Sequence, residues 1–297
     1  MNIPRILLND SYTMPQIGLG VWQAKNGEEV QHAVHAAIDN GYRLIDTAAL
    51  YANEDGVGEA IASSGVPREE IFLTTKLWNA DHGYDNALRA FDASLERLGT
   101  EYVDLYLIHW PVPQTDKYVE TWHALEEIKK SGRAKSIGVC NFPIPELERL
   151  IAESDTVPAI NQIELHPRLQ QQELRDYCAS KGIHVESWSP IGGTGGDLLD
   201  DPILVEIAKK HTKSSAQVVI RWHIQLGLIV IPKSVHPDRI AQNIDVFDFS
   251  LSDDDMTQIA SLNTNTRRGP DPSVFGNHMN TGVVRLAQKF GIGKLKK

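Results

Sequence analysis

The sequence has few cysteines, fewer basic than acidic residues and no long apolar run. Cys140 and Cys178 are the only cysteines among 297 residues, and neither lies in a CxxC pattern. The sequence therefore predicts neither a disulfide scaffold nor a structural zinc site, and a reducing cytoplasm fits. Lysine and arginine total 29 against 39 acidic residues, a formal net charge of -10, which argues against a broad surface for nucleic acid or anionic membranes. Because no run approaches the ~20 apolar residues of a spanning helix and the N-terminus lacks a signal-peptide core, we expect a cytoplasmic protein.

The rest of the composition is that of an ordinary globular protein, with 41% hydrophobic and 23% charged residues. An α/β barrel of roughly 250 residues commonly folds as one unit with one large core. We therefore predict a single domain over residues 1–297.

Short β-branched or apolar runs alternate with longer amphipathic stretches, a pattern typical of βα units around a parallel sheet. The pattern predicts eight strands, at Leu44–Asp46, Ile71–Lys76, Leu105–His109, Ser136–Cys140, Ala159–Ile163, His184–Trp188, Leu228–Ile231 and Val246–Asp248. It predicts helices at Glu28–Asn40, Tyr84–Leu98, Val119–Ser131, Pro145–Glu153, Gln171–Ser180, Pro202–His211, Ala216–Leu226 and Pro237–Asn243.

The glycine-rich stretches do not favour an open, doubly wound sheet. Neither the stretch 18–20 nor the stretch 192–196 has the GxGxxG spacing that opens a dinucleotide-binding helix. We therefore predict a closed (β/α)8 TIM barrel with its active site at the C-terminal ends of the strands. Residues Arg5–Asn9 and Gln16–Gly18 are expected to form a hairpin that closes the bottom of the barrel, and Asn263–Asn280 a long C-terminal loop.

Polar residues interrupt the strands at the ends where a barrel enzyme carries its chemistry. They are Asp46, Lys76, His109, Asn141 and Gln162. Each alone is more often a satisfied structural group. Five at one rim favour a functional site.

The residue types at this rim suit proton donation without a nucleophile. A lysine close to Tyr51 is expected to lower the pKa of the phenol, an aspartate to hold the lysine, and a neutral His109 to orient a carbonyl oxygen. No GxSxG elbow and no HExxH motif is present, which disfavours serine hydrolysis and metal catalysis. His32 and His35 fit a solvated helix face better than a metal site, so no metal is expected.

A second group of residues lies around the seventh predicted strand. Lys233, Ser234 and Arg239 suit a phosphate, although a solvated basic turn has the same composition. In a chain of net charge -10, a local basic cluster at the predicted active rim favours the phosphate interpretation. Trp188 ends a strand where its indole could stack on a cofactor ring, while tryptophans are more often part of a core.

Ordered motifs along the chain closely resemble those of the aldo-keto reductases. They are Leu44–Ala48 with Tyr51, Thr74–Trp78, Leu105–Pro111, Gly138–Phe142, Asn161–Pro167 and Ile231–Ser234, and they span about Ile6 to Leu262. Within that family, Glu186–Pro190 and Asn243–Phe249 are most similar to the bacterial 2,5-diketo-D-gluconate reductase branch.

The resemblance implies a monomeric barrel that reduces aldehydes and ketones, among them dicarbonyls or ketoacids, with NADPH and without a metal. It implies Tyr51 as general acid, Lys76 and Asp46 as its support and His109 as the group that orients the carbonyl. The implied cofactor contacts are Val21, Trp22, Asp46, Cys140, Asn141, Gln162, Trp188, Ser189, Ile191, Lys233, Ser234, Val235, Arg239, Gln242 and Asn243. The implied substrate contacts are Trp22, Tyr51, Trp78, His109 and Trp110, under the loop of Pro270–Pro272.

Three features depart from the family pattern. Cys140 stands where serine is usual, Gln242 where glutamate is common, and the stretch 274–278 matches no pattern. A second interpretation of the whole chain is a cofactor-binding subunit with little turnover.

Overall fold

A closed parallel sheet lies at the centre of the computed structural model, which describes residues 3–193 and 197–276. Its strands are β3 (Leu19–Gly20), β4 (Leu44–Asp46), β5 (Phe72–Leu77), β6 (Val103–Ile108), β7 (Ala134–Cys140), β8 (Ile160–Glu164), β9 (His184–Trp188) and β10 (Ile229–Val230). Neighbouring strands pair in parallel and in chain order. Parallel bridges from Ile17 to Val230 and from Gly20 to Lys233 join the first strand to the last. The predicted (β/α)8 barrel is confirmed.

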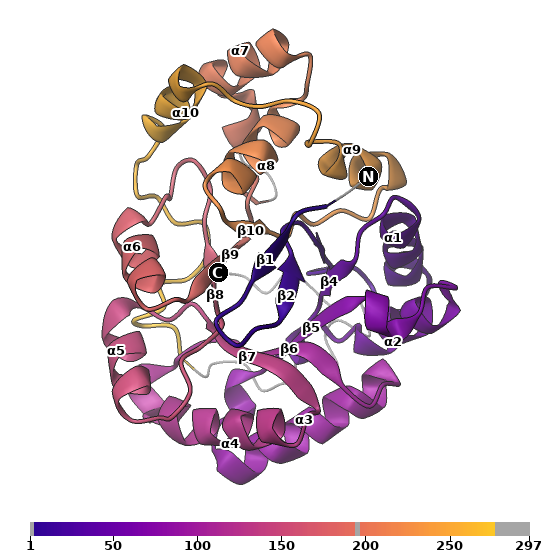
Figure 1. The fold of residues 1–297 in the computed structure, drawn as a ribbon, viewed down its shortest axis with the longest axis vertical. Helices are drawn as coiled ribbons and strands as arrows, with labels where there is room; N and C mark the ends of the chain where they lie inside the picture. The colour runs from indigo at the N-terminus through magenta and orange to yellow at the C-terminus, as the bar shows by residue number, and fades with distance from the viewer. Residues whose placement is uncertain (1–2, 194–196, 277–297) are drawn as a thin grey trace.

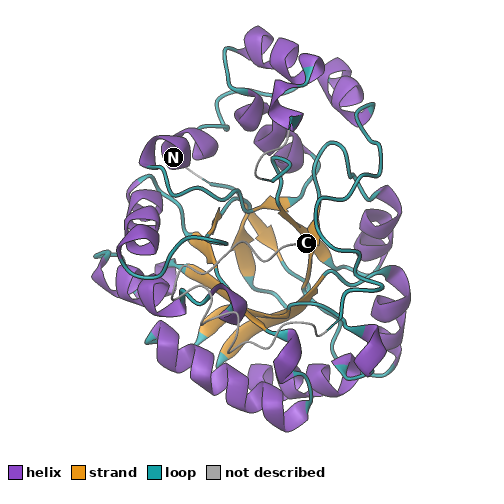
Figure 2. Ribbon diagram, turned by 180° about the vertical axis from the view of Figure 1, so that it is seen from behind, coloured by secondary structure: helices purple, strands orange, loops and turns teal. Residues whose placement is uncertain are grey.

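Helices form an outer ring around the strands, as Figures 1 and 2 show from opposite sides. They are α1 (Glu28–Asp39), α2 (Glu54–Ser63), α3 (Tyr84–Leu98), α4 (Tyr118–Lys130), α5 (Ile144–Ala152), α6 (Gln172–Ser180), α7 (Pro202–His211), α8 (Ser215–Gln225), α9 (Pro237–Ile244) and α10 (Asp253–Ala260). Short 3-10 turns lie at Ala49–Tyr51, Arg68–Glu70, Asn79–Asp81, Pro113–Thr115 and Leu198–Asp200. Among the residues described, no helix is both long and apolar enough to cross a membrane.

Side chains along each strand point alternately into the barrel and out toward the helices, which gives an inner and an outer packed layer. In β6, Leu105 and Leu107 belong to the cluster inside the barrel, whereas Tyr106 and Ile108 pack outward against the helices. Gly138 of β7 faces inward, where an added Cβ would lie 2.6 Å from the carbonyl oxygen of Ile160. Only a residue without a side chain fits at that point.

A hairpin of β1 (Arg5–Leu7) and β2 (Thr13–Pro15) crosses the barrel opening in Figure 1. Leu8 and Met14 are buried in the same cluster as Leu44 and Phe72, the first residues of β4 and β5. The hairpin therefore closes the end of the barrel where the strands begin, as predicted. The second strand of the hairpin is Thr13–Pro15 and not the predicted Gln16–Gly18. Residues 16–18 pair with β10 instead, because the Val230 amide donates to the Gln16 carbonyl and the Gly18 amide donates to the Val230 carbonyl.

The prediction of a strand at Val246–Asp248 is wrong. Val246 is buried against the helices, and its carbonyl accepts a hydrogen bond from the Arg221 side chain at 3.2 Å. The position beside β10 is occupied by the chain around β3, a strand of two residues that the hydrophobic pattern did not indicate. Helices α2 and α10 were also not predicted, and residues 277–280 of the predicted C-terminal loop lie outside the described residues.

Candidate active site

Buried polar side chains at the ends of β4 and β5 form a charged centre inside the barrel. Lys76 and Asp46 face inward, and both are almost fully buried. The Lys76 Nζ donates to Asp46 Oδ1 at 2.6 Å, to the Thr47 carbonyl at 2.9 Å and to the Tyr51 hydroxyl at 3.4 Å. Each of the three ammonium protons therefore has an acceptor. The sequence prediction that these residues meet agrees with this geometry.

The ion pair keeps Lys76 charged in spite of its burial. Burial is the largest single influence on the pKa of Lys76 and lowers it, but the charge and hydrogen bond of Asp46, together with Tyr51 and Cys140, outweigh burial, and the net shift is upward. Burial also raises the pKa of Asp46 above its ordinary value, and the charge of Lys76 offsets part of that rise. A positive charge is thus held beside the Tyr51 hydroxyl.

Tyr51 is the last residue of the 3-10 turn that follows β4. Burial raises the pKa of Tyr51 well above its ordinary value, and the charge of Lys76 lowers it by less. The expected influence of Lys76 is present, but the prediction of a net lowered pKa is wrong for this structure. Tyr51 therefore keeps its proton at neutral pH, which is the form that a proton donor needs.

His109 follows β6 and continues the inward alternation of Leu105 and Leu107. Burial, and next the charge of Lys76, hold the pKa of His109 well below its usual range, so the ring is neutral. Its ring centre lies 5.8 Å from that of Tyr51 and 5.3 Å from that of Trp78. The buried Nδ1 has no hydrogen-bond partner among the described residues.

Asn141 connects the histidine to a tryptophan across the mouth of the barrel. It follows β7 with φ 61°, in the left-handed region that asparagine tolerates. Its Nδ2 donates to the His109 carbonyl at 3.1 Å, and its Oδ1 accepts the Trp188 Nε1 at 2.8 Å. Asn141 therefore fixes the edge of the Trp188 indole.

Gln162 joins Asp46 to a carboxyl group that the sequence analysis did not place in the site. Its Nε2 donates to Asp46 Oδ2 at 2.8 Å and to Glu186 Oε2 at 2.7 Å. Burial, and next the negative charge of Asp46, raise the pKa of Glu186 to about 8. A charged residue within a buried strand is the same signal that pointed to Lys76, and it could have identified Glu186.

Aromatic side chains surround Tyr51 and His109 on the open side. The ring centre of Trp22 lies 4.8 Å from that of Tyr51, and Trp22 remains 40% exposed. Trp78, Trp110 and Val112 form a buried cluster, against which Tyr51, Trp188 and Phe275 pack. The structure thus brings together all the predicted substrate contacts and adds Phe275, which no sequence pattern indicated.

The basic group lies where β10 ends and α9 begins. Lys233, Arg239 and Gln242 are exposed, whereas Ser234 and Asn243 are buried. The Ser234 hydroxyl accepts the His236 amide at 3.1 Å, in the turn that leads into α9. Within the described part of the chain, neither Lys233 nor Arg239 forms an ion pair. Both cations are thus available to an anionic ligand.

The remaining predicted cofactor contacts lie around the same end of the barrel. Val21 directly follows β3, and its amide donates to the Asp46 carbonyl at 3.1 Å. Ser189 follows β9 with φ 49°, and Ile191 packs on the outer core. Cys140 is fully buried at the end of β7, and Val235 is partly buried before α9.

His32 and His35 on α1 do not form a metal site with each other. His35 Nε2 lies 3.0 Å from both the Ala60 carbonyl and the Ser63 hydroxyl, at the contact between α1 and α2. No group of three or more His, Cys, Asp or Glu in residues 3–193 and 197–276 could hold a metal ion.

The profile of the Aldo/keto reductase family matches residues 16–264. The chain belongs to the aldo/keto reductase family. An aldo-keto reductase of Mycolicibacterium smegmatis is 61% identical over 272 residues, which cover 92% of this chain and 98% of that protein. A protein of Escherichia coli named methylglyoxal reductase DkgA is 53% identical over 271 residues, 91% of this chain and 98% of its own length.

Solved structures agree with this assignment. A mutant of Gox0644 in complex with NADPH superposes with a TM-score of 0.89 at 50% identity, covering 93% of this chain and all of that one. This aldo/keto reductase is therefore an enzyme of known fold, and its predicted site residues lie at the rim where barrel enzymes carry their chemistry.

Proposed function

We propose that this aldo/keto reductase reduces small aldehydes, ketones and dicarbonyl compounds, including ketoacids, to alcohols with NADPH. The observation that carries the proposal is the Lys76 Nζ, which contacts both Asp46 and the Tyr51 hydroxyl inside the barrel. The relative named methylglyoxal reductase supports a dicarbonyl substrate. We also propose that the enzyme acts as a monomer in the cytoplasm, and light scattering tests the monomer.

Several observations fit NADPH. The Trp188 indole is fixed by Asn141 beside the catalytic rim, where it can stack on a planar ring. Lys233 and Arg239 lie near the start of α9 without an ion pair among the described residues and suit the 2'-phosphate, and Cys140, Asn141 and Gln162 would hold the carboxamide. NADPH supplies the hydride when it is bound.

The chain's own residues handle the carbonyl oxygen. The Tyr51 hydroxyl donates its proton to that oxygen as negative charge develops on it. Lys76 stays protonated and stabilises the resulting phenolate, because its charge lies 3.4 Å from the Tyr51 oxygen. The neutral ring of His109 orients the oxygen by a hydrogen bond. Asp46 holds Lys76 in place.

Tyr51→Phe tests this function. General acid catalysis contributes roughly 10²- to 10⁴-fold, so we expect kcat to fall by that factor while the Kd for NADPH changes little. NADPH oxidation is followed by absorbance over a panel of aldehydes, dicarbonyls and ketoacids, and fluorescence titration gives the Kd. Tyr12→Phe is the matched control, because Tyr12 is 45% exposed.

The two alternatives predict different results. A Tyr51→Phe rate close to that of wild type would refute the assignment of the general acid. A wild-type protein that binds NADPH and reduces nothing on the panel would favour a cofactor-binding subunit.

A further inference from the structure

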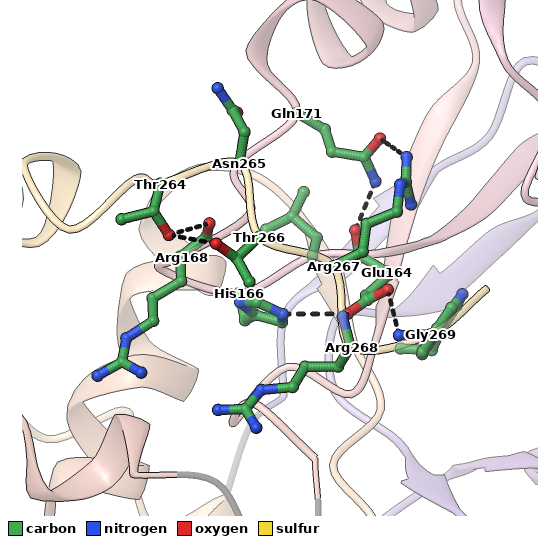
Figure 3. Close-up of polar contacts among 12 residues, drawn as sticks. Glu164, His166, Arg168, Gln171, Thr264, Asn265, Thr266, Arg267, Arg268 and Gly269 are labelled. Atoms are coloured by element: carbon green, nitrogen blue, oxygen red, sulfur yellow. Dashed lines mark hydrogen bonds and ion pairs between the residues drawn. The ribbon is translucent and has the colours of Figure 1, made fainter. Parts of the chain in front are cut away.

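The segment 264–269, which follows α10, is tied to the connection between β8 and α6. Figure 3 shows the side chains of this segment beside Arg168, Gln171 and Glu164. The amides of Thr264 and Thr266 both donate to the Arg168 carbonyl, at 3.2 and 3.1 Å. The Arg267 side chain donates to Gln171 Oε1 at 3.1 Å, and the Gln171 Nε2 donates to the Glu164 carbonyl. These bonds hold the segment beside the end of β8.

Glu164 makes the closest contacts to this segment. It is the last residue of β8, faces inward and is fully buried. Its Oε1 accepts the Arg268 amide at 2.6 Å, and its Oε2 accepts the Gly269 amide at 3.0 Å. The His166 Nε2 lies 3.2 Å from Oε1 (Figure 3). Glu164 thus accepts the hydrogen bonds of both amides that directly precede Pro270.

The carboxylate is set up to accept these bonds as an anion. Burial alone would raise the pKa of Glu164, but the hydrogen bonds from His166 and from the two amides lower it overall. Hydrogen bonds to an ionised acceptor are roughly twice as strong as those between neutral groups. A buried, charged and fully engaged carboxylate gives the segment a rigid attachment.

The attachment places Gly269 directly against Trp188. A Cβ built on Gly269 would lie 2.4 Å from Trp188 Cη2 and 3.1 Å from Glu164 Oε2. No larger residue fits without displacing the indole or the carboxylate. The segment therefore limits where Trp188, which also donates to Asn141, can lie.

The chain that continues from the attachment covers the aromatic side of the site. The Gln114 side chain donates to the Ser273 carbonyl at 2.9 Å. The ring centre of Phe275 lies 4.5 Å from that of Trp110 and 6.4 Å from that of Trp78. Phe275 is six residues beyond Gly269, so the position of its ring depends on where the segment is held.

We propose that Glu164 is a positioning residue, which fastens residues 264–269 to the end of β8 and thereby sets the places of Phe275 over the substrate and of Trp188 beside the cofactor. The inference rests on the proposed function, since it assigns a substrate to the space under Phe275. Glu164 touches neither substrate nor cofactor in this role. It acts on substrate binding through the loop that it holds.

Glu164→Gln tests the attachment, because one carboxylate oxygen becomes an NH2 group that cannot accept either backbone amide. We expect the KM for the carbonyl substrate to rise about tenfold, the equivalent of one charge-assisted hydrogen bond. The kcat and the Kd for NADPH should stay within about twofold of wild type, because the groups that contact the reacting atoms are unchanged and Asn141 still holds the Trp188 indole. Glu173→Gln is the matched control, because Glu173 lies exposed in the first turn of α6. It should leave all three constants unchanged.

Hydrogen–deuterium exchange of the backbone amides measures the attachment without requiring catalytic turnover. In Glu164→Gln, the peptide that contains the amides of Arg268 and Gly269 should exchange faster, while peptides from β4 and β5 should not. If wild type reduces no carbonyl, the proposed function fails, and this exchange still tests the attachment. Unchanged exchange would overturn the inference. Faster exchange with an unchanged KM would limit Glu164 to a structural contact and would also overturn the positioning role.

If Glu164→Gln does not fold, a second variant tests the inference while leaving the barrel and the Glu164 carboxylate unchanged. Gly269→Ala changes only the segment, and its methyl group must push the chain away from Trp188. We expect a rise in the substrate KM together with a changed tryptophan fluorescence spectrum. Wild-type values of both would contradict the inference.

Discussion

Lys76→Met removes the charge at the centre of the site while keeping a side chain of similar length. The variant loses the bond of 2.6 Å to Asp46 and the bond of 2.9 Å to the Thr47 carbonyl. Removal of one partner of a buried ion pair costs about 3–5 kcal/mol, because the other charge stays buried without compensation. We expect the free energy of unfolding to fall by that amount, and carbonyl reduction to be lost.

The loss of stability should depend on pH. Burial already raises the pKa of Asp46, and removing the positive charge of Lys76 raises it further. When the pKa of an acid is higher in the folded state than in the unfolded state, the folded protein keeps a proton that the unfolded chain has released. Stability then falls as pH rises through that window, by up to about 1.4 kcal/mol per pH unit. The difference between Lys76→Met and wild type should therefore be larger at pH 8 than at pH 5.

Urea denaturation followed by circular dichroism at pH 5, 6.5 and 8 measures this difference. The double variant Asp46→Asn/Lys76→Met carries neither charge, so it should recover most of the lost stability and none of the activity. Lys130→Met, at an exposed lysine of α4, should change stability by less than about 0.5 kcal/mol. A loss below about 1 kcal/mol in Lys76→Met, equal at pH 5 and pH 8, would refute the reasoning.

Two further predictions concern Glu186 and the basic group. Because the pKa of Glu186 is raised to about 8, the folded enzyme keeps this proton from about pH 4.3 upward and loses stability as pH rises to 8. Glu186→Gln should flatten this dependence in urea titrations, by up to about 1.4 kcal/mol per pH unit, and an unchanged slope would contradict the assignment. Arg239→Ala should weaken NADPH binding by roughly 10- to 150-fold and NADH binding far less, as measured by fluorescence titration. An equal loss for both cofactors would mean that Arg239 does not bind the 2'-phosphate.

Much of the site could be predicted because its residues break a local rule. A strand buried on both faces should be apolar, so Asp46 and Lys76 stand out in the sequence without knowledge of any contact. Alternation along a strand then orients such residues, since Leu105, Leu107 and His109 must share one face. Glu186 follows the same rule, and it was missed because no separate chemical role suggested it.

The closed barrel was predicted from the alternation of strands and helices, but the strand that closes it was assigned to the wrong residues. Leu19–Gly20 is too short to show a period, and it forms a strand only because β4 and the end of β10 lie on either side of it. Val246–Asp248 has strand-forming residues, yet in the described part of the chain the edge of β10 is already paired with the segment around β3. A strand needs a partner, and which partner is available is decided by the whole sheet.

The sequence by itself determined which chemical groups stand at the ends of the strands, because the spacing of charged residues within apolar runs is a local property of the chain. Only the tertiary structure decided what those groups contact. The bonds from Glu164 to the amides of Arg268 and Gly269 join residues more than 100 positions apart. The raised pKa of Tyr51 likewise follows from burial, which the packing of distant segments creates. Contacts and burial of this kind arise when the chain closes on itself, and no local pattern encodes them.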